Sequence, residues 1–193
     1  FRPDSLKSFM TYVSNNGDYS RCFAFDLTGM SDLEIDGQGS LFLFKGYVCP
    51  FYVNKAQGIT LRNFTIDYER TFHSEGHIAE VTKSYMDVVF SKEYPYYVDD
   101  NDHLRFVDDE GVEYPWFYML EFDAQKRETA YMARDQWTGG GVKATDLGNG
   151  RVRLYRENLK GIVGNIINFG MAYRKVPVVT VSDSKDFALH NVT

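Results

Sequence analysis

The residues best suited to contact a sugar lie in one short run near residue 70. Ile66-Asp67-Tyr68-Glu69-Arg70 combines two carboxylates, a phenol and a guanidinium. These groups can accept and donate the hydrogen bonds that sugar hydroxyls make. We therefore predict that Asp67, Tyr68 and Arg70 contact a glycan, in a cleft between two parts of the chain. The alternative is an ion-paired hinge, in which Arg70 neutralises Asp67 or Glu69.

Histidine and cysteine offer no comparable site. His73 and His77 could share a metal ion if they lay on a helix, but Ser74-Glu75-Gly76 between them argues against a helix and favours a solvated linker. Cys22 and Cys49 lack the paired spacing of a zinc site. We expect no metal and no cofactor, and we assign no catalytic residue.

Aromatic residues offer a second possible sugar surface. Trp116, Phe117, Tyr118 and Trp137 could form a platform for a sugar ring. The aromatic residues of a small β-domain more often fill its core, so the core interpretation is favoured.

Charge and hydropathy exclude two classes of partner. The formal net charge is −6, and no run of Lys or Arg is long enough to follow a phosphate backbone, which argues against nucleic acid. No apolar stretch approaches the roughly 18 residues of a membrane span.

Internal repetition shows which elements must position these side chains. Two copies of one apolar pattern occur 26 residues apart, with Phe25, Leu27, Leu33 and Ile35 in the first and Phe51, Val53, Ile59 and Leu61 in the second. Each copy predicts two strands joined by a turn. Within each strand apolar residues alternate with other residues, as on a strand with one buried face. This is typical of the rungs of a parallel β-solenoid.

A third copy closes the chain. Val181, Phe187 and Leu189 follow Val53, Ile59 and Leu61 at a distance of 128 residues. Because this distance exceeds one rung by about a hundred residues, we expect an inserted domain, with boundaries 1–72 for the first rungs, 73–175 for the insertion and 176–193 for the returning rung. The last rung ends at Thr193 without a cap, so we expect truncation there, and an open edge of this kind can form a homo-oligomer.

The insertion has its own strand pattern. Strands are predicted at 78–81, 86–90, 104–107, 116–122 and 151–156, and Gly148-Asn149-Gly150 is a tight hairpin signal because these residues tolerate positive φ. The fold class is therefore all-β, with parallel rungs interrupted by an antiparallel barrel-like or sandwich domain.

Small polar residues at the rung turns have structural interpretations. Gly37 and Gly39 might suggest a phosphate loop, but no Lys follows and the next segment is a strand, so they predict a sharp turn with Asp36 accepting backbone hydrogen bonds. Asn63 and Asn191 both begin a glycosylation sequon but occupy the same rung position. A stacked asparagine ladder is therefore favoured over glycan attachment.

Three runs carry a resemblance to a known family. Leu33-Glu34-Ile35-Asp36-Gly37-Gln38-Gly39-Ser40, Cys49-Pro50-Phe51-Tyr52-Val53 and the segment 59–68 resemble the bacterial α-1,3-galactosidases of glycoside hydrolase family 110. The resemblance implies a right-handed parallel β-helix with an inserted β-barrel, in a secreted or periplasmic enzyme. It also implies cleavage of terminal α-galactose from blood-group-B-type or linear α-1,3-linked glycans, with inversion and without a metal. The family's catalytic carboxylates lie on later rungs, so this chain alone is expected to be inactive.

Two other functions remain open. A non-catalytic carbohydrate-binding or adhesive solenoid would use the aromatic residues of the insertion to bind glycans. A pectate-lyase-like or polygalacturonase-like β-helix would act on acidic polysaccharide, to which an acidic chain is poorly suited.

Overall fold

The computed structural model describes residues 1–12, 18–108, 110–139, 142–170 and 176–193. No α-helix occurs in these ranges, and a single 3-10 turn, η1 (Pro3–Ser5), precedes the first strand. No helix in them is long and apolar enough to cross a membrane. The chain forms two compact units, unit 1 from Phe1–Arg70 and Tyr173–Thr193, and unit 2 from Thr71–Ala172. The all-β prediction is confirmed for the part of the chain that is described.

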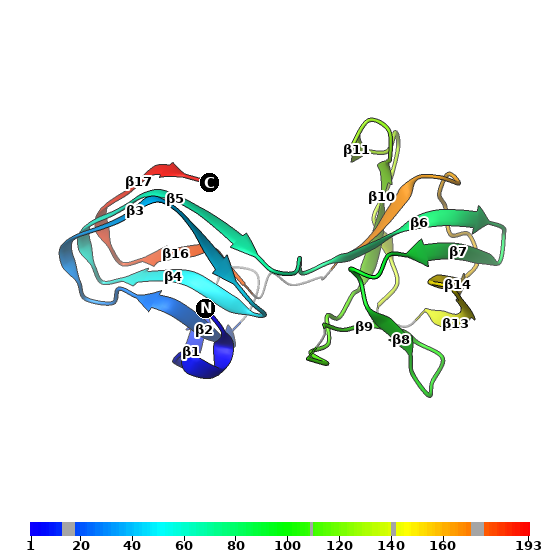
Figure 1. Cartoon of the computed structure of the whole chain (residues 1–193), viewed down its shortest axis with the longest axis horizontal. Helices are drawn as coiled ribbons and strands as arrows, with labels where there is room; N and C mark the ends of the chain where they lie inside the picture. Colours follow the sequence, from blue (N-terminus) through cyan, green and yellow to red (C-terminus); the bar gives the residue numbers. More distant parts are fainter. Residues whose placement is uncertain (13–17, 109, 140–141, 171–175) are drawn as a thin grey trace. The chain divides into compact units, whose positions relative to one another are not determined.

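Unit 1 consists of two sheets that face each other (Figure 1). One sheet has the order β1-β2-β4-β16, with β1 (Ser8–Tyr12), β2 (Asp18–Asp26), β4 (Val48–Asn54) and β16 (Val179–Ser182). The other has the order β17-β5-β3, with β3 (Ser31–Phe44), β5 (Gln57–Tyr68) and β17 (Lys185–Val192). Apolar residues from both sheets form the core between them, among them Phe51, Val53, Ile59, Leu61 and Phe64.

The pairing register of unit 1 confirms the repeat. β2 pairs with β4 in parallel, with Phe25 opposite Phe51, and β3 pairs with β5 in parallel, with Leu33 opposite Ile59. The third copy joins the same stack, because Val181 lies opposite Val53 and Leu189 opposite Leu61. Among the described strands of unit 1, only β1 departs from the repeat: it pairs antiparallel with β2, which the repeat did not predict.

The predicted turn at Gly37 is a bulge inside one long strand. The register of β3 against β5 shifts between Asp36 and Ser40, and Asp36 Oδ1 accepts the backbone N–H of Gln38 at 2.9 Å, as predicted. A Cβ atom at Gly37 would lie 2.6 Å from the Cβ of Phe64, so only glycine allows the two strands to approach this closely. The chain therefore bends here without leaving the sheet.

The asparagine ladder is confirmed. Asn191 Nδ2 donates to Asn63 Oδ1 at 3.2 Å, and Asn63 Nδ2 donates to Asp36 Oδ1 at 3.1 Å. Asn63 and Asn191 have φ values of 58° and 52°, a left-handed conformation that asparagine adopts more readily than most residues. Asn63 and Asn191 thus link the same position of two successive rungs, and Asp36, which lies opposite Arg62, extends the hydrogen bonds to the first rung.

Replacing Asn63 with alanine is expected to lower the free energy of unfolding by about 2 kcal/mol, because the left-handed conformation and two ladder hydrogen bonds both act at this position. Asn63→Gly is the matched control. It loses the same hydrogen bonds but tolerates the positive φ, so about half of the effect should remain. Urea unfolding followed by far-UV circular dichroism measures both, and equal losses would contradict a contribution from backbone conformation.

Unit 2 is an antiparallel β-domain. Its main sheet has the order β11-β10-β15-β6-β7-β14-β13, β12 also pairs with β10, and β8 and β9 form a separate hairpin. The strands are β6 (Ser74–Val81), β7 (Tyr85–Phe90), β8 (Tyr96–Val98), β9 (Leu104–Phe106), β10 (Tyr118–Asp123), β11 (Glu128–Thr129), β12 (Gln136–Trp137), β13 (Lys143–Gly148), β14 (Arg151–Tyr155) and β15 (Ile166–Gly170). Every pairing among them is antiparallel, as predicted for the insertion.

The hairpin signal is confirmed, and one predicted linker is wrong. β13 turns into β14 through Gly148, Asn149 and Gly150, all with positive φ. The segment around His77, predicted as a solvated linker, belongs to β6. Its inward positions before Ile78 are occupied by Ser74 and Gly76, both buried. These small residues hide the alternation of apolar and polar residues by which a strand is recognised.

The predicted boundaries 1–72, 73–175 and 176–193 remain a prediction about separately folding domains, because compactness does not show that either unit folds alone. The boundary at 175 lies outside the described residues. Cys22 and Cys49 are both buried free thiols, and burial raises the pKa of Cys49 to about 12. These two thiols therefore pack as small apolar groups.

Candidate functional site

The three predicted sugar-contact residues lie at the end of β5. Asp67 Oδ1 accepts the backbone N–H of Tyr68 at 2.8 Å. The Tyr68 hydroxyl donates to the carbonyl of Val48 at 3.0 Å, and burial raises the pKa of the phenol. Arg70 follows two residues after the strand. Because its hydroxyl already bonds within unit 1, Tyr68 has a structural role, and sugar contact by Asp67, Tyr68 and Arg70 stays a prediction.

The aromatic residues of unit 2 divide between core and surface. Trp116 is buried, donates its indole N–H to the carbonyl of Leu104 at 3.0 Å and packs edge-on against Phe169. The core interpretation is therefore confirmed for Trp116. Trp137 lies on the surface with 57% of its area exposed, and its ring centroid is 5.4 Å from that of Tyr118.

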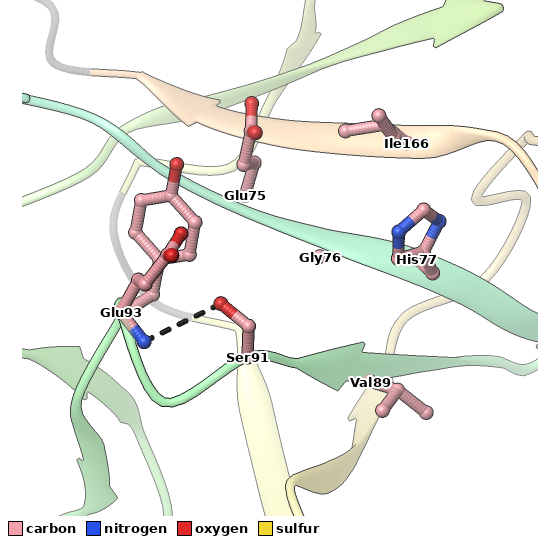
Figure 2. A pocket seen from close by; sticks show the side chains of 8 residues that line it. Glu75, Gly76, His77, Val89, Ser91, Glu93 and Ile166 are labelled. Atoms are coloured by element: carbon pink, nitrogen blue, oxygen red, sulfur yellow. Dashed lines mark hydrogen bonds between the residues drawn. The ribbon is translucent and has the colours of Figure 1, made fainter. Parts of the chain in front are cut away.

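A pocket of about 210 Å³ lies on the outer side of β6, β7 and β15 (Figure 2). It combines acidic, hydroxyl and imidazole groups with apolar walls. Its lining residues are Glu75, Gly76, His77, Val89, Ser91, Glu93, Tyr94 and Ile166.

Strand alternation explains why β6 contributes to this pocket. Glu75 and His77 are two residues apart and so project to the same face of β6, whereas Gly76 faces the core. A Cβ atom at Gly76 would lie 2.5 Å from Val88 Cγ1. His77 lies between its cross-strand neighbours Val89 on β7 and Ile166 on β15.

The turn that follows β7 holds the other polar groups. The backbone N–H of Glu93 donates to Ser91 Oγ at 3.4 Å, as drawn in Figure 2, and the N–H of Tyr94 donates to the carbonyl of Ser91 at 3.2 Å. The pKa of the Tyr94 phenol is raised, chiefly by burial and then by the charge of Glu75. Tyr94 therefore stays protonated at neutral pH, and its hydroxyl remains a hydrogen-bond donor in the pocket.

This arrangement can bind the hydroxyls of a small polar ligand. Carboxylate, hydroxyl and imidazole groups converge beside the apolar side chains of Val89 and Ile166, a combination found in many ligand pockets. Glu75 lies near the protonated Tyr94 phenol, and Glu93 is exposed to solvent. The geometry thus offers hydrogen-bond acceptors for a sugar, and we assign no proton-transfer step to it.

Sequence reasoning missed this pocket. Glu75 was considered only as a residue that argues against a helix, and Ser91, Glu93 and Tyr94 were not considered. The polar turn 91–94 after an apolar strand is a visible signal, but its contact with Glu75 depends on how β6 and β7 pair. Within the described ranges, no group of three His, Cys, Asp or Glu side chains could hold a metal ion.

Comparison with known proteins identifies relatives of the chain. Residues 74–167 match the family described as GLAA-B beta-barrel domain I. An alignment of 186 residues, covering 94% of this chain and 30% of the relative, is 38% identical to alpha-1,3-galactosidase A of Shewanella woodyi. Alpha-1,3-galactosidase B of Bacteroides thetaiotaomicron is 30% identical over 145 residues, which are 74% of this chain and 23% of that protein. The chain therefore spans about 30% or less of the length of these relatives.

Proposed function

Because this chain belongs to the family of the bacterial α-1,3-galactosidases, we propose that it is part of a glycoside hydrolase that removes terminal α-1,3-linked galactose from glycans. The observation that carries the proposal is the alignment of 94% of the chain with a protein of that name. Since the alignment covers 30% of that relative, the activity is assigned to a larger protein that contains this chain. A glycan substrate also suits a secreted or periplasmic enzyme, which is the location that we propose.

Unit 1 is proposed to be the first part of a right-handed parallel β-helix, with unit 2 as an inserted barrel. The proposal is supported by three copies of the strand pair that stack in one register. Val181 and Leu189 on the edge strands are 43% and 48% exposed, whereas Val53 and Leu61, at the same positions of the preceding rung, are fully buried. Further rungs would bury Val181 and Leu189 in the same way.

The catalytic carboxylates are proposed to lie on such further rungs. An inverting glycosidase uses one carboxylic acid and one carboxylate, roughly 6.5 to 9.5 Å apart, on opposite sides of the scissile bond. In unit 2, Glu75 and Glu93 are instead assigned to bind sugar hydroxyls, because both carboxylates line one pocket and Glu93 is open to water. This chain would then contribute binding and structural support, while proton transfer occurs elsewhere.

A chimeric enzyme tests the proposal. This chain replaces the matching segment of the Shewanella woodyi α-1,3-galactosidase A, and release of galactose from an α-1,3-linked galactobiose is measured. We expect a kcat/KM within about tenfold of the parent enzyme, and no galactose release by the 193-residue chain alone. Tyr94→Phe in the chimera should raise KM several-fold with little change in kcat, because the hydroxyl of Tyr94 lines the pocket and can donate to the sugar.

Tyr97→Phe, at an exposed tyrosine outside the pocket, is the matched control and should leave KM unchanged. A folded chimera that binds the disaccharide without releasing galactose would favour a carbohydrate-binding or adhesive protein instead. Galactose release by the chain alone would overturn the placement of the catalytic carboxylates.

A further inference from the structure

Exposed apolar side chains gather around a second pocket of unit 2. This pocket has a volume of about 370 Å³, and its lining includes Glu121, Tyr131, Met132, Gln136, Lys160 and Ile162. Tyr131 has 92% of its area exposed, and Met132 and Ile162 are also largely exposed. Clustered exposed apolar side chains often mark a binding surface.

One rim of the pocket is a closed turn that presents Tyr131. The backbone N–H of Ala130 donates to the carbonyl of Glu121 at 3.0 Å, and the N–H of Ala133 donates to the carbonyl of Ala130 at 3.0 Å. Met132 has a φ of 57°, a conformation that a long side chain rarely adopts. The turn is therefore held in one shape, with Tyr131 directed to solvent.

The opposite rim is fixed by a reciprocal pair of hydrogen bonds. Gln136 Nε2 donates to the carbonyl of Lys160 at 2.8 Å, and the N–H of Lys160 donates to Gln136 Oε1 at 2.8 Å. A Cβ atom at the next residue, Gly161, would lie 2.6 Å from Ile78 Cδ1, so this segment packs directly on the core. The pocket is thus formed before any ligand arrives, which lowers the entropic cost of binding.

A buried carboxylate contributes to the pocket lining. Glu121 is only 8% exposed, and its Oε1 accepts the N–H of Ile162 at 2.8 Å and Nδ2 of Asn165 at 2.7 Å. In the part of the chain that is described, no group donates to Glu121 Oε2. This oxygen is open to solvent at the pocket, so it can accept a hydrogen bond from a donor on a ligand. A ligand with hydroxyl groups supplies one.

We propose that this pocket binds a neutral hexopyranose unit of a glycan, separately from the pocket at Glu75. A sugar hydroxyl donates to Glu121 Oε2, the C–H face of the ring packs on Tyr131, and the Arg134 and Lys160 side chains at the rim can donate to the outer hydroxyls. A sugar carboxylate placed against Glu121 would be repelled, so the group that contacts this oxygen is a neutral hydroxyl. The choice of galactose as the probe rests on the proposed function, whereas the pocket assignment does not.

The test is a titration of the ¹⁵N-labelled 193-residue chain with an α-1,3-linked galactobiose, followed residue by residue by NMR. We expect saturable shifts at 130–133 and 160–162, with a millimolar dissociation constant. Tyr131→Ala and Glu121→Gln should each weaken this binding about tenfold. The Glu121→Gln side chain keeps one oxygen that can accept from Ile162 and Asn165, but an NH2 group, which is a donor, replaces the acceptor Oε2.

Tyr12→Ala removes another largely exposed aromatic ring, in unit 1, and should not change the binding. Three results would overturn the inference: no shift at these segments up to the solubility limit, unchanged affinity in Tyr131→Ala, or tighter binding of N-acetylneuraminic acid at the same segments. Shifts confined to Glu75, Ser91 and Glu93 would also overturn it while supporting the proposed function. Saturable shifts at 130–133 together with an inactive chimera would support the inference and count against the proposed function.

Discussion

Replacing Asp87 with alanine is expected to lower the free energy of unfolding of unit 2 by about 3 kcal/mol. The Asp87 side chain is completely buried, and its two oxygens accept from Arg153 Nε at 2.7 Å and from Arg151 Nε at 2.9 Å. Arg153 also lies 3.8 Å from the centre of the Tyr85 ring, and Arg151 pairs with Glu80 at 3.0 Å. Because both guanidinium groups reach solvent, the loss stays below that of a fully buried ion pair.

The effect of Asp87→Ala should depend on pH. Hydrogen bonds from Arg153 and then Arg151 hold the pKa of Asp87 below its usual value, although burial acts in the opposite direction. A carboxyl group with a lowered folded-state pKa stabilises the fold above its unfolded pKa, near 3.9, and this contribution is lost as the pH falls through the folded value. The difference between the two proteins should therefore be full at pH 7 and shrink below about pH 4.

Urea unfolding followed by tryptophan fluorescence measures this effect selectively, since both tryptophans, Trp116 and Trp137, belong to unit 2. Asp100→Ala, at an exposed aspartate, is the matched control and should change stability by less than about 0.5 kcal/mol. Equal losses for the two variants, or a loss in Asp87→Ala that persists undiminished in acid, would show that the arginine pairs do not stabilise unit 2.

Replacing Phe51 with alanine is expected to lower the free energy of unfolding of unit 1 by about 4 kcal/mol, because it leaves a cavity in the middle of the stack. Phe51 is fully buried on β4. Its ring is stacked on Phe25 of the preceding rung at 4.8 Å between centroids and on Phe64 at 5.5 Å. Amide hydrogen exchange of β4 and β5 measures the loss within unit 1.

Leu41→Ala, at a residue that is 57% exposed on β3, is the control and should change this protection little. If the two units unfold independently, tryptophan fluorescence should report the same unfolding midpoint in Phe51→Ala and in the unmodified chain. Unchanged exchange of the β4 amides in Phe51→Ala would contradict a shared core of stacked rings.

The repeat could be predicted because it follows from a local rule. In stacked parallel strands, residues at the same position of each copy meet one another, so Leu33, Ile59 and Phe187 show the register directly in their spacing. The antiparallel nature of unit 2 was also predictable, from alternating strands and from the hairpin at Asn149. The start of β6 was not, because Ser74 and Gly76 occupy its inward positions.

The candidate sites, in contrast, could not be predicted from the spacing of residues in the sequence. Asp67, Tyr68 and Arg70 are conspicuous because they are consecutive, yet the Tyr68 hydroxyl bonds to the carbonyl of Val48, twenty residues earlier in the chain. Glu121 has an ordinary position on an alternating strand. Its burial and its bond to the backbone of Ile162 depend on how the segment after β14 folds back over β10.

By itself, the sequence determined the all-β class, the parallel register of unit 1 and the presence of an insertion, because these depend on periodic contacts between equivalent positions. Only the tertiary structure decided which polar side chains share a pocket. Glu75 lines one pocket with Ser91 and Glu93, and Glu121 accepts a hydrogen bond from Ile162. Strand pairing in unit 2 brings these residues together although their separations along the sequence follow no repeat. No periodicity in the chain encodes such contacts, so the two proposed sugar sites became visible only in three dimensions.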